Sequence, residues 1–390
     1  MSGVFHLALR HATAHRGRSA VLTLCLTLVV GLPLLSRGLV SAFESELRDR
    51  AETVPLIIGA KGSRFDLVFA ALHFQKVDTD PIAFRVFDRL RTDPLATAIP
   101  IHMRFTAQGY PVLGTSFEYF QHARLTFTSG RPPARLGEAV IGSRVAETLG
   151  LSAGDTIQSD QLRGYDITAA PALLMDIAGV LAPSDGPEDL AVIVDIETAW
   201  VLEGIAHGHE SPETIEETKL LARTDDHIAL SGAVVEYQRI TADNADSFHI
   251  HGDRSDLPLT GVLLFPFDDK SRTILQTRIN ASEAEQAVSP SRVTDDLIAF
   301  VVRIKSLLDA IAITLGLVTS AMLGLIILLS YRVRASEVRT LLEIGVSRRA
   351  TAGVFAAEIG VLLLIAAGAA LLVVSTSAEV GGSLILRFIT

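Results

Sequence analysis

Two short histidine motifs contain the side chains best suited to chemistry in this sequence. One is His207-Gly-His209-Glu210 and the other is His249-Ile-His251-Gly-Asp253. Imidazole nitrogens and carboxylate oxygens are ligands for Zn²⁺ and related divalent ions. Alternation within a loop does not bring two imidazoles onto one ion, and the two loops are separate in the sequence. We therefore expect solvated histidines at His207, His209, His249 and His251, with a metal site as the alternative.

The glycine-rich stretch Gly59-Ala-Lys-Gly-Ser63 has a lysine and a serine but not the order or spacing of a phosphate-binding loop. We interpret it as a turn. The sequence has no G-x-x-x-x-G-K-[ST], G-x-S-x-G or H-E-x-x-H motif. We therefore expect no catalytic residue, and no cofactor bound by this chain.

The composition indicates a membrane protein. Of 390 residues, 49% are hydrophobic and 20% charged, and the mean hydropathy is +0.39. These values exclude a disordered chain and a collagen, and one cysteine, Cys25, excludes a disulfide scaffold. The net charge of -10 argues against a nucleic-acid partner.

Three apolar runs are long enough to cross a bilayer: Ala20–Ser36 with its continuation, Ala310–Tyr331 and Ala352–Val374. We place the spans at 19–42, 307–331 and 351–375. A cleaved signal peptide, ending at Val40-Ser41-Ala42, is the alternative for the first. In the third, Glu358 should face a partner helix or the membrane interface, with a transport site as the alternative.

The distribution of charge along the chain predicts its orientation in the membrane. Residues 1–18 form a basic N-terminal segment and 332–350 a basic loop, so both should be cytoplasmic. Between Phe43 and Ala310 there are 40 acidic and 24 basic residues. The block 43–306 should therefore lie outside the membrane, in the periplasm or the extracellular space, and 376–390 should be a short tail.

The outer block is expected to fold as a large α+β domain. Turn residues separate short apolar runs typical of strands from helix-like stretches. The runs are Pro55–Ile58, Pro111–Leu113, Ala139–Ile141, Leu173–Val180, Ala191–Val194, Lys219–Ala222 and Thr260–Phe267; the helix-like stretches are Ser143–Leu149, Glu197–Glu203 and Lys270–Asn280.

A two-helix stalk is predicted at the ends of this block. Ser289-Pro290 is a good helix start, and a heptad stripe follows it into the second span. The stripe comprises Val293, Leu297, Phe300, Ile304, Leu307 and Ile311; Val40, Phe43, Leu47, Ala51 and Val54 extend the first span in the same way. The stripes could pack together as a stalk, with two ordinary surface helices as the alternative.

The loop after the second span resembles that of MacB/FtsX-type ABC transporter permeases, whose pattern is R-x-x-E-[IV]-x-x-L-x-x-[IL]-G-[AV]-S-x-R. Arg334, Glu337, Leu341, Ile344, Gly345, Ser347 and Arg349 fill this pattern. The outer block has three sequence motifs similar to those of the family's extracytoplasmic domain: Gly130-Arg-Pro132, Glu138-Ala-Val-Ile-Gly142 and Leu149-Gly-Leu-Ser-Ala-Gly-Asp155.

The resemblance implies a permease subunit of an ABC system in the bacterial inner membrane. ATP and Mg²⁺ would be bound by a separate ATPase subunit, and two permease chains, alike or different, would pair. A periplasmic partner and membrane lipid are further expected contacts. The ATPase contact is expected on Arg334, Glu337, Arg339, Glu343, Gly345, Ser347, Arg348 and Arg349, with a lipid anchor as the alternative.

One departure concerns the C-terminus, because such permeases usually have a fourth span. Here 376–390 contains Gly381, Gly382 and Arg387 and is too short to cross. We expect either an outer C-terminus or a shortened member of the family. A ligand sensor or regulator without transport is the alternative function.

Overall fold

The computed structural model describes residues 16–75, 79–160, 172–208, 220–223, 228–230, 239–250 and 252–333, and scattered residues from 339 to 375. The chain divides into two compact units. The sheet unit comprises the described residues of Arg48–Thr294, and the helical unit those of Met1–Leu47 and Asp295–Phe388.

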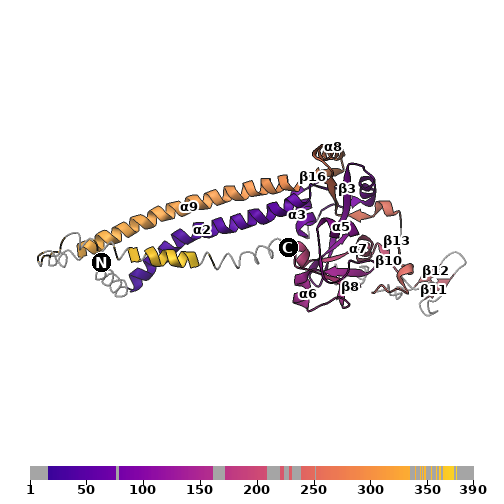
Figure 1. Cartoon of the computed structure of the whole chain (residues 1–390), viewed down its shortest axis with the longest axis horizontal. Coiled ribbons are helices and arrows are strands. Elements are labelled where there is room, and N and C mark those ends of the chain that lie inside the picture. Colours follow the sequence, from indigo (N-terminus) through magenta and orange to yellow (C-terminus); the bar gives the residue numbers. More distant parts are fainter. Residues whose placement is uncertain are drawn as a thin grey trace. The chain divides into compact units, whose positions relative to one another are not determined.

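The sheet unit is built on one large mixed sheet (Figure 1). Its strand order is β16-β1-β15-β3-β4-β9-β6-β8-β5, and β7 pairs with β8. The pairs β4–β9 and β6–β8 are parallel and the others antiparallel. The strands are β1 (Leu56–Ala60), β3 (Ala96–Ala107), β4 (Tyr110–Thr115), β5 (Phe127–Gly130), β6 (Glu138–Ile141), β7 (Thr156–Gln158), β8 (Leu174–Leu181), β9 (Val192–Asp195), β15 (Gly261–Pro266) and β16 (Glu285–Val288).

Three short strand pairs and several helices complete the unit, so the predicted α+β class is confirmed. The pairs are β2 (Ile82–Ala83) with β14 (Pro258–Leu259), β10 (Ala206–His207) with β13 (His249–Ile250), and β11 (Leu220–Arg223) with β12 (Ile228–Leu230). The helices are α3 (Arg64–His73), α4 (Phe84–Arg91), α5 (Phe117–His122), α6 (Ser143–Leu149), α7 (Ile196–Leu202) and α8 (Asp269–Asn280), with 3₁₀ turns η1 (Pro187–Leu190), η3 (Ala245–Ser247) and η4 (Arg254–Asp256).

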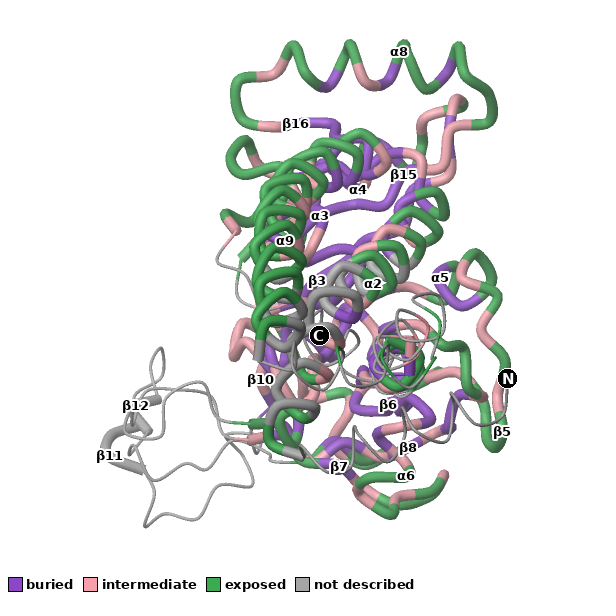
Figure 2. The backbone as a smooth tube through the Cα atoms, turned by 90° about the vertical axis from the view of Figure 1, so that its left-hand side faces the viewer, coloured by how far each residue is buried: buried purple, intermediate pink, exposed green. Residues whose placement is uncertain are grey.

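The apolar runs form strands because both faces of the sheet are covered. In β1, Leu56 and Ile58 belong to one apolar cluster and Ile57 to the other, as expected for alternating side chains. Residues of α4, α7 and α8 fill the first cluster, and residues of α3 and α5 fill the second. Figure 2 shows the central strands as largely buried.

Two long helices begin and end the described fold. Helix α2 runs for 38 residues, Arg16–Thr53, and α9 for 44 residues, Pro290–Val333. The predicted start of α9 at Pro290 is confirmed, and α2 extends to Thr53 as its periodicity indicates. Ser63 accepts a hydrogen bond from the amide of Asp66 and caps α3, so the glycine-rich stretch is the end of β1 and the turn into that helix.

Small residues bring α2 close to the helical residues 363–372 in the helical unit. A Cβ added at Gly31 would lie 3.6 Å from the Cβ of Ala370, and the Thr27 hydroxyl lies 3.5 Å from the carbonyl oxygen of Ala366. Ala366 and Ala370 are fully buried. The small residues Gly31, Ala366 and Ala370 therefore allow a close approach of the two helices.

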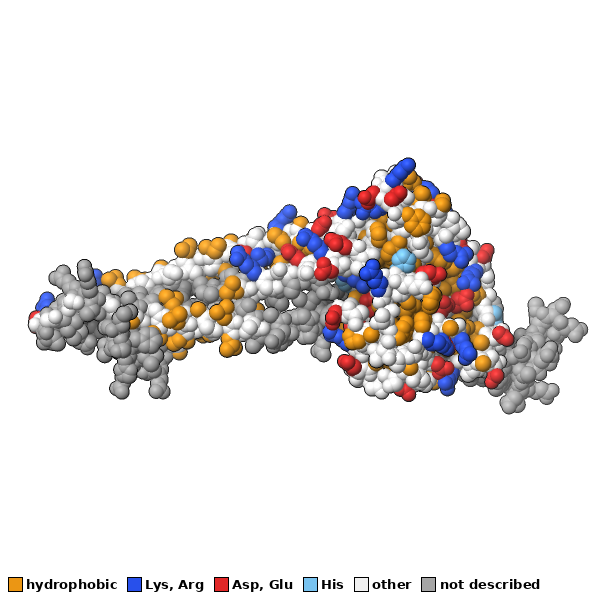
Figure 3. Space-filling view, in the orientation of Figure 1, with side chains coloured by type: hydrophobic (Ala, Val, Ile, Leu, Met, Phe, Trp, Pro, Cys, Tyr) orange, Lys and Arg blue, Asp and Glu red, His pale blue; other side chains and the backbone are white. Residues whose placement is uncertain are grey.

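Helix α9 exposes many large apolar side chains in its second half. Leu307, Ile313, Leu317, Leu325 and Leu329 are each more than three-fifths exposed, and Figure 3 shows hydrophobic side chains along the helices. A surface of this kind is typical of a segment that contacts an apolar partner. Within the part of the chain that the structure describes, no helix meets the length and apolarity needed to cross a membrane.

Candidate functional site

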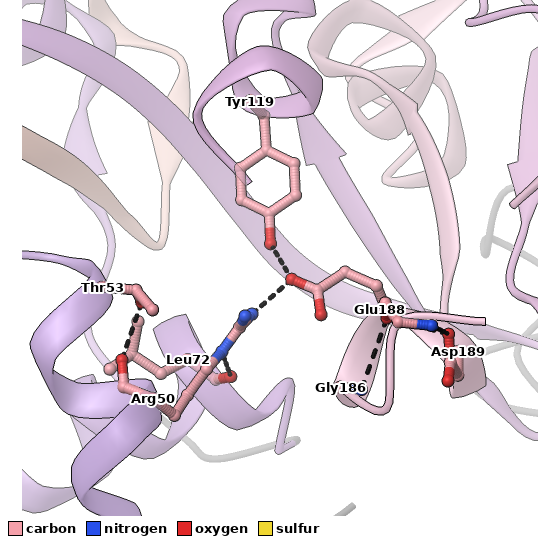
Figure 4. A network of polar contacts seen from close by, with 8 residues as sticks. Arg50, Thr53, Leu72, Tyr119, Gly186, Glu188 and Asp189 are labelled. Atoms are coloured by element: carbon pink, nitrogen blue, oxygen red, sulfur yellow. Dashed lines mark hydrogen bonds and ion pairs between the residues drawn. The ribbon is translucent and has the colours of Figure 1, made fainter. Parts of the chain in front are cut away.

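The last turn of α2 belongs to the sheet unit and takes part in a buried charge cluster there (Figure 4). The Arg50 guanidinium makes an ion pair with the carboxylate of Glu188, and its Nε donates a hydrogen bond of 3.1 Å to the carbonyl of Leu72. The Tyr119 hydroxyl donates to the same Glu188 oxygen over 2.6 Å. Helices α2, α3 and α5 and the turn η1 therefore meet at one carboxylate.

The turn that carries Glu188 is rigidly folded. The side chain of its neighbour Asp189 accepts hydrogen bonds from the amide and hydroxyl of Ser184, both 2.9 Å, and from the amide of Asp185 at 3.0 Å. Asp189 is buried, and the Glu188 side chain is only 2% exposed. The turn next to the carboxylate that binds Arg50 is thus fixed by its own hydrogen bonds.

Burial shapes the electrostatics of the cluster. Burial alone would lower the pKa of Arg50, but the adjacent Glu188 carboxylate outweighs it and raises that pKa. Burial, and then the Glu188 charge, raises the pKa of Tyr119 well above its usual value. Burial, reinforced by the positive charge of Arg50, lowers the pKa of His73 to about 4. Arg50 is therefore charged, and Tyr119 and His73 are neutral, at neutral pH.

A cavity of about 300 Å³ adjoins the cluster. Its walls are mostly apolar, and Arg50 and Tyr119 lie at its edge; the lining is Arg50, Thr53, Val54, Ala71, Leu72, Tyr119, His122, Ala123, Arg124, Leu263 and Phe265. Close-packed interiors resist side-chain movement, whereas an open pocket of this size gives the side chains that line it room to shift. The end of α2 is thus fixed by charge and flanked by free volume.

The η1 turn lies closely against Gly142, and we expect Gly142→Ala to displace this turn. A Cβ there would lie 2.2 Å from the carbonyl oxygen of Glu188 and 2.3 Å from that of Asp189. Overpacking of this kind costs about 1–3 kcal/mol. The loss should appear as a lower midpoint of thermal unfolding, followed by fluorescence of the only tryptophan, Trp200, which is fully buried.

Gly62→Ala is the matched control, because a Cβ at Gly62 meets no atom within 4 Å. It should leave the unfolding midpoint almost unchanged. Equal midpoints for Gly142→Ala and the native chain would show that the η1 turn tolerates displacement.

Two of the outer-domain motifs that carry the family resemblance contain residues that stabilise a loop. Arg131 binds Glu138 through two bonds of 2.6 and 2.7 Å, and the Glu138 carboxylate also accepts from the amides of Ala134 and Arg135. Gly130 adopts φ +78°, where a Cβ would lie 2.1 Å from a carbonyl oxygen. These residues hold the loop between β5 and β6, and Gly142 follows directly after β6.

The residues expected to contact an ATPase are only partly described. Arg339 and Glu343 are helical and exposed, Gly345 has φ +95°, and Ser347 is exposed. Arg334, Glu337, Arg348 and Arg349 lie outside the described residues. The ATPase contact therefore stays a prediction.

The predicted stalk stripe is displaced on α9. Val293 is buried and Leu297 half-buried, but Phe300 and Ile304 are 59% and 47% exposed. The less exposed positions lie one residue further along: Thr294, Ile298, Val301, Lys305, Asp309 and Ala312. Ile298, Val301 and Val302 widen the apolar surface beyond the predicted stripe, so the spacing does not single out one packed face. On α2, Leu47 is buried, and the side chain of Phe43 lies outside the described set.

Of the four candidate metal ligands, two are described. His207 is half-buried on β10 and His249 exposed on β13, and the structure pairs them across these strands. His209 and His251 lie outside the described residues. The described part of the chain contains no group of three or more potential metal ligands.

The charge cluster was missed from the sequence, although one signal for it exists. Arg50 falls on the apolar stripe that contains Leu47 and Val54, at helical spacing from both. A charged residue on a face that must be buried requires a partner. No comparable signal marks Glu188, since Ser184-Asp-Gly-Pro-Glu-Asp189 reads as an exposed turn.

Comparison with known proteins decides the family. The family model described as the MacB-like periplasmic core domain matches residues 20–236, more than half of the chain. The chain belongs to this MacB-like family. The match begins within α2 and includes the whole charge cluster.

Solved structures of two family members are similar to this MacB-like chain. The periplasmic region of MacB from Actinobacillus actinomycetemcomitans is 9% identical, with a TM-score of 0.36, covering 64% of this chain and 97% of that one. The extracellular domain of the noncanonical ABC-type transporter YknZ from Gram-positive bacteria is 12% identical, with a TM-score of 0.32, covering 60% and 98%. No curated protein matches the chain.

Proposed function

We propose that this MacB-like chain is the permease subunit of an ABC transport system. The observation that carries the proposal is the family match over residues 20–236, in a chain whose sheet unit is flanked in the sequence by the long helices α2 and α9. Continuous helices of this length are suited to passing movement along their axes. The movement would serve export, the handling of a lipoprotein or lipid, or mechanotransmission.

The membrane segments of the proposal are 19–42, 307–331 and 351–375. The exposed apolar side chains of α9, from Leu307 to Leu329, would then contact lipid, which removes them from water. The basic segments 1–18 and 332–350 would face the cytoplasm, and the sheet unit would lie in the periplasm or outside the cell.

ATP and Mg²⁺ would be bound by a separate ATPase subunit that contacts the loop 332–350. The exposed side chains of Arg339, Glu343 and Ser347 support this role, since each is accessible to a partner. A second permease chain, alike or different, would complete the transporter.

Movement would reach the outer domain through the end of α2. Any shift of this helix acts directly on Arg50, and through Glu188 on the η1 turn between β8 and β9. ATP binding could bias such a movement only through contacts that differ between two states. The ion pair and its adjoining cavity are the elements of this chain best suited to that role.

We expect charge reversal in the cytoplasmic loop to release the ATPase. Replacing Arg339, Arg348 and Arg349 by Glu should abolish its co-purification with the full chain in mild detergent, because like charges at an interface cost several kcal/mol. The measurement is the ATPase-to-permease ratio in the eluate.

Reversal of Arg64, Arg135 and Arg272 to Glu is the matched control. These three arginines are exposed in the sheet unit, and the control carries the same change of net charge. It should retain the ATPase. Retention by the loop variant as well would place the contact elsewhere, and absence of any ATPase from the native preparation would contradict the subunit role.

A further inference from the structure

The short strands β10 and β13 bring together two histidines that lie far apart in the sequence (Figure 1). Ala206 is opposite Ile250, and His207 is opposite His249. Ala206 is buried, and Ile250 packs against the first apolar cluster. Since strand side chains alternate, the core fixes the inner pair and His207 and His249 lie together on the outer side.

The spacing of the two imidazoles suits a shared ion. Their ring centroids are 5.1 Å apart, with the ring planes at 62°. Two imidazoles bound to one tetrahedral Zn²⁺ through bonds of about 2.0–2.1 Å place their centroids about 5 Å apart. The separation of the two rings on the strand pair is therefore compatible with a shared ion.

The tautomer of His249 is set for metal binding. Its Nδ1 lies 2.9 Å from the carbonyl oxygen of Ser247. A carbonyl can only accept, so Nδ1 carries the proton and the neutral ring has its lone pair on Nε2. Metal-binding histidines commonly donate their second nitrogen to a backbone carbonyl in this way, which fixes the orientation of the ring.

From this geometry we propose that His207 and His249 bind a divalent cation of the Zn²⁺ class. Two imidazole nitrogens select Zn²⁺, Ni²⁺ or Cu²⁺ over Mg²⁺ and Ca²⁺, which prefer oxygen. The described residues contain no group of three such ligands, and the proposal concerns the histidine pair. The site would tie β13 to β10, which itself contacts α7. It does not depend on the proposed transport function.

The test is calorimetric titration of the full chain, purified without a polyhistidine tag, with ZnCl₂ and NiCl₂. The native chain should bind one ion at this site, and His207→Gln and His249→Gln should each weaken binding at least tenfold. MgCl₂ and CaCl₂ should give no binding. The unfolding midpoint without metal, read from Trp200, shows whether each variant is folded.

Two control variants keep the outcome specific. His122→Gln removes an exposed imidazole of α5 that stacks on Phe265, and it should not change the affinity. A variant with His209→Gln and His251→Gln tests the neighbouring histidines. The proposal is overturned if the native chain binds no Zn²⁺, or if both His207→Gln and His249→Gln retain native affinity.

Discussion

Arg50→Met should destabilise the sheet unit by about 3–5 kcal/mol, because it leaves the Glu188 carboxylate buried without a counter-charge. Methionine retains much of the arginine stem, so packing changes little. For a unit of this size each kcal/mol lowers the unfolding midpoint by about 2–4 °C. The measurement is thermal unfolding of the full chain in detergent micelles, followed by the fluorescence of Trp200.

The double variant Arg50→Met with Glu188→Leu separates the stability that the ion pair contributes from the cost of leaving the Glu188 charge buried and unpaired. Replacing both partners of a buried pair by apolar groups is often close to neutral, so the double variant should recover most of the lost stability. Arg85→Met is the matched control: its pair with Asp256 is about two-thirds exposed on both sides and should contribute at most about 1 kcal/mol.

These variants also test whether the cluster transmits movement. A double variant of native stability still lacks the charge contact between α2 and η1. Under the proposed function it should bind the ATPase normally and hydrolyse ATP, but drive the outer domain less effectively. Native stability of Arg50→Met alone would show instead that Glu188 reaches water or another cation.

The strands that could be predicted are those with a continuous apolar run. Ala139–Ile141 and Ala191–Val194 correspond to β6 and β9, which are buried on both faces. The longest strand, β3, was not predicted, because Pro100, His102 and Arg104 interrupt its run. The strands β15 and β4 pair with its two edges, and this pairing cannot be seen in the sequence of β3 itself.

Helix ends were predicted better than helix faces. Pro290 marks the start of α9 because proline fits the first turn, a property of one residue alone. The packed face depends on what lies opposite, and the apolar surface of α9 is wider than the face that is packed. The pairing of His207 with His249 is likewise a tertiary property, since 42 positions separate the two residues.

The charge cluster could be predicted only in part, because one of its residues is marked by the local sequence and its partners are not. A helix pattern can identify Arg50 as a charge on an apolar face, but its partner lies on a turn more than a hundred residues away. Tyr119 and His73 join the cluster from two further helices. Their roles follow from burial and from the Arg50 charge, which only the folded chain defines.

His73 should make the sheet unit sensitive to acid. The folded protein keeps its imidazole neutral down to about pH 4, whereas the unfolded chain takes up a proton near pH 6.5. Between these values the unfolded state binds more protons, so stability rises with pH. This contribution is complete above about pH 6.5 and is lost as the pH falls towards 4, up to about 3 kcal/mol in total.

His73→Leu removes this titration while retaining an apolar contact for Phe69, whose ring lies 5.4 Å from that of His73. Carboxylates also titrate in this range, so the informative quantity is the difference in unfolding midpoint between variant and native chain at pH 7 and pH 4.5. His73→Leu should lose less stability on acidification, and His122→Gln, an exposed histidine, should follow the native chain. Because the Arg50 charge helps to keep His73 neutral, Arg50→Met should also reduce the acid sensitivity. Parallel curves for His73→Leu and the native chain would mean that His73 is protonated in the fold without cost.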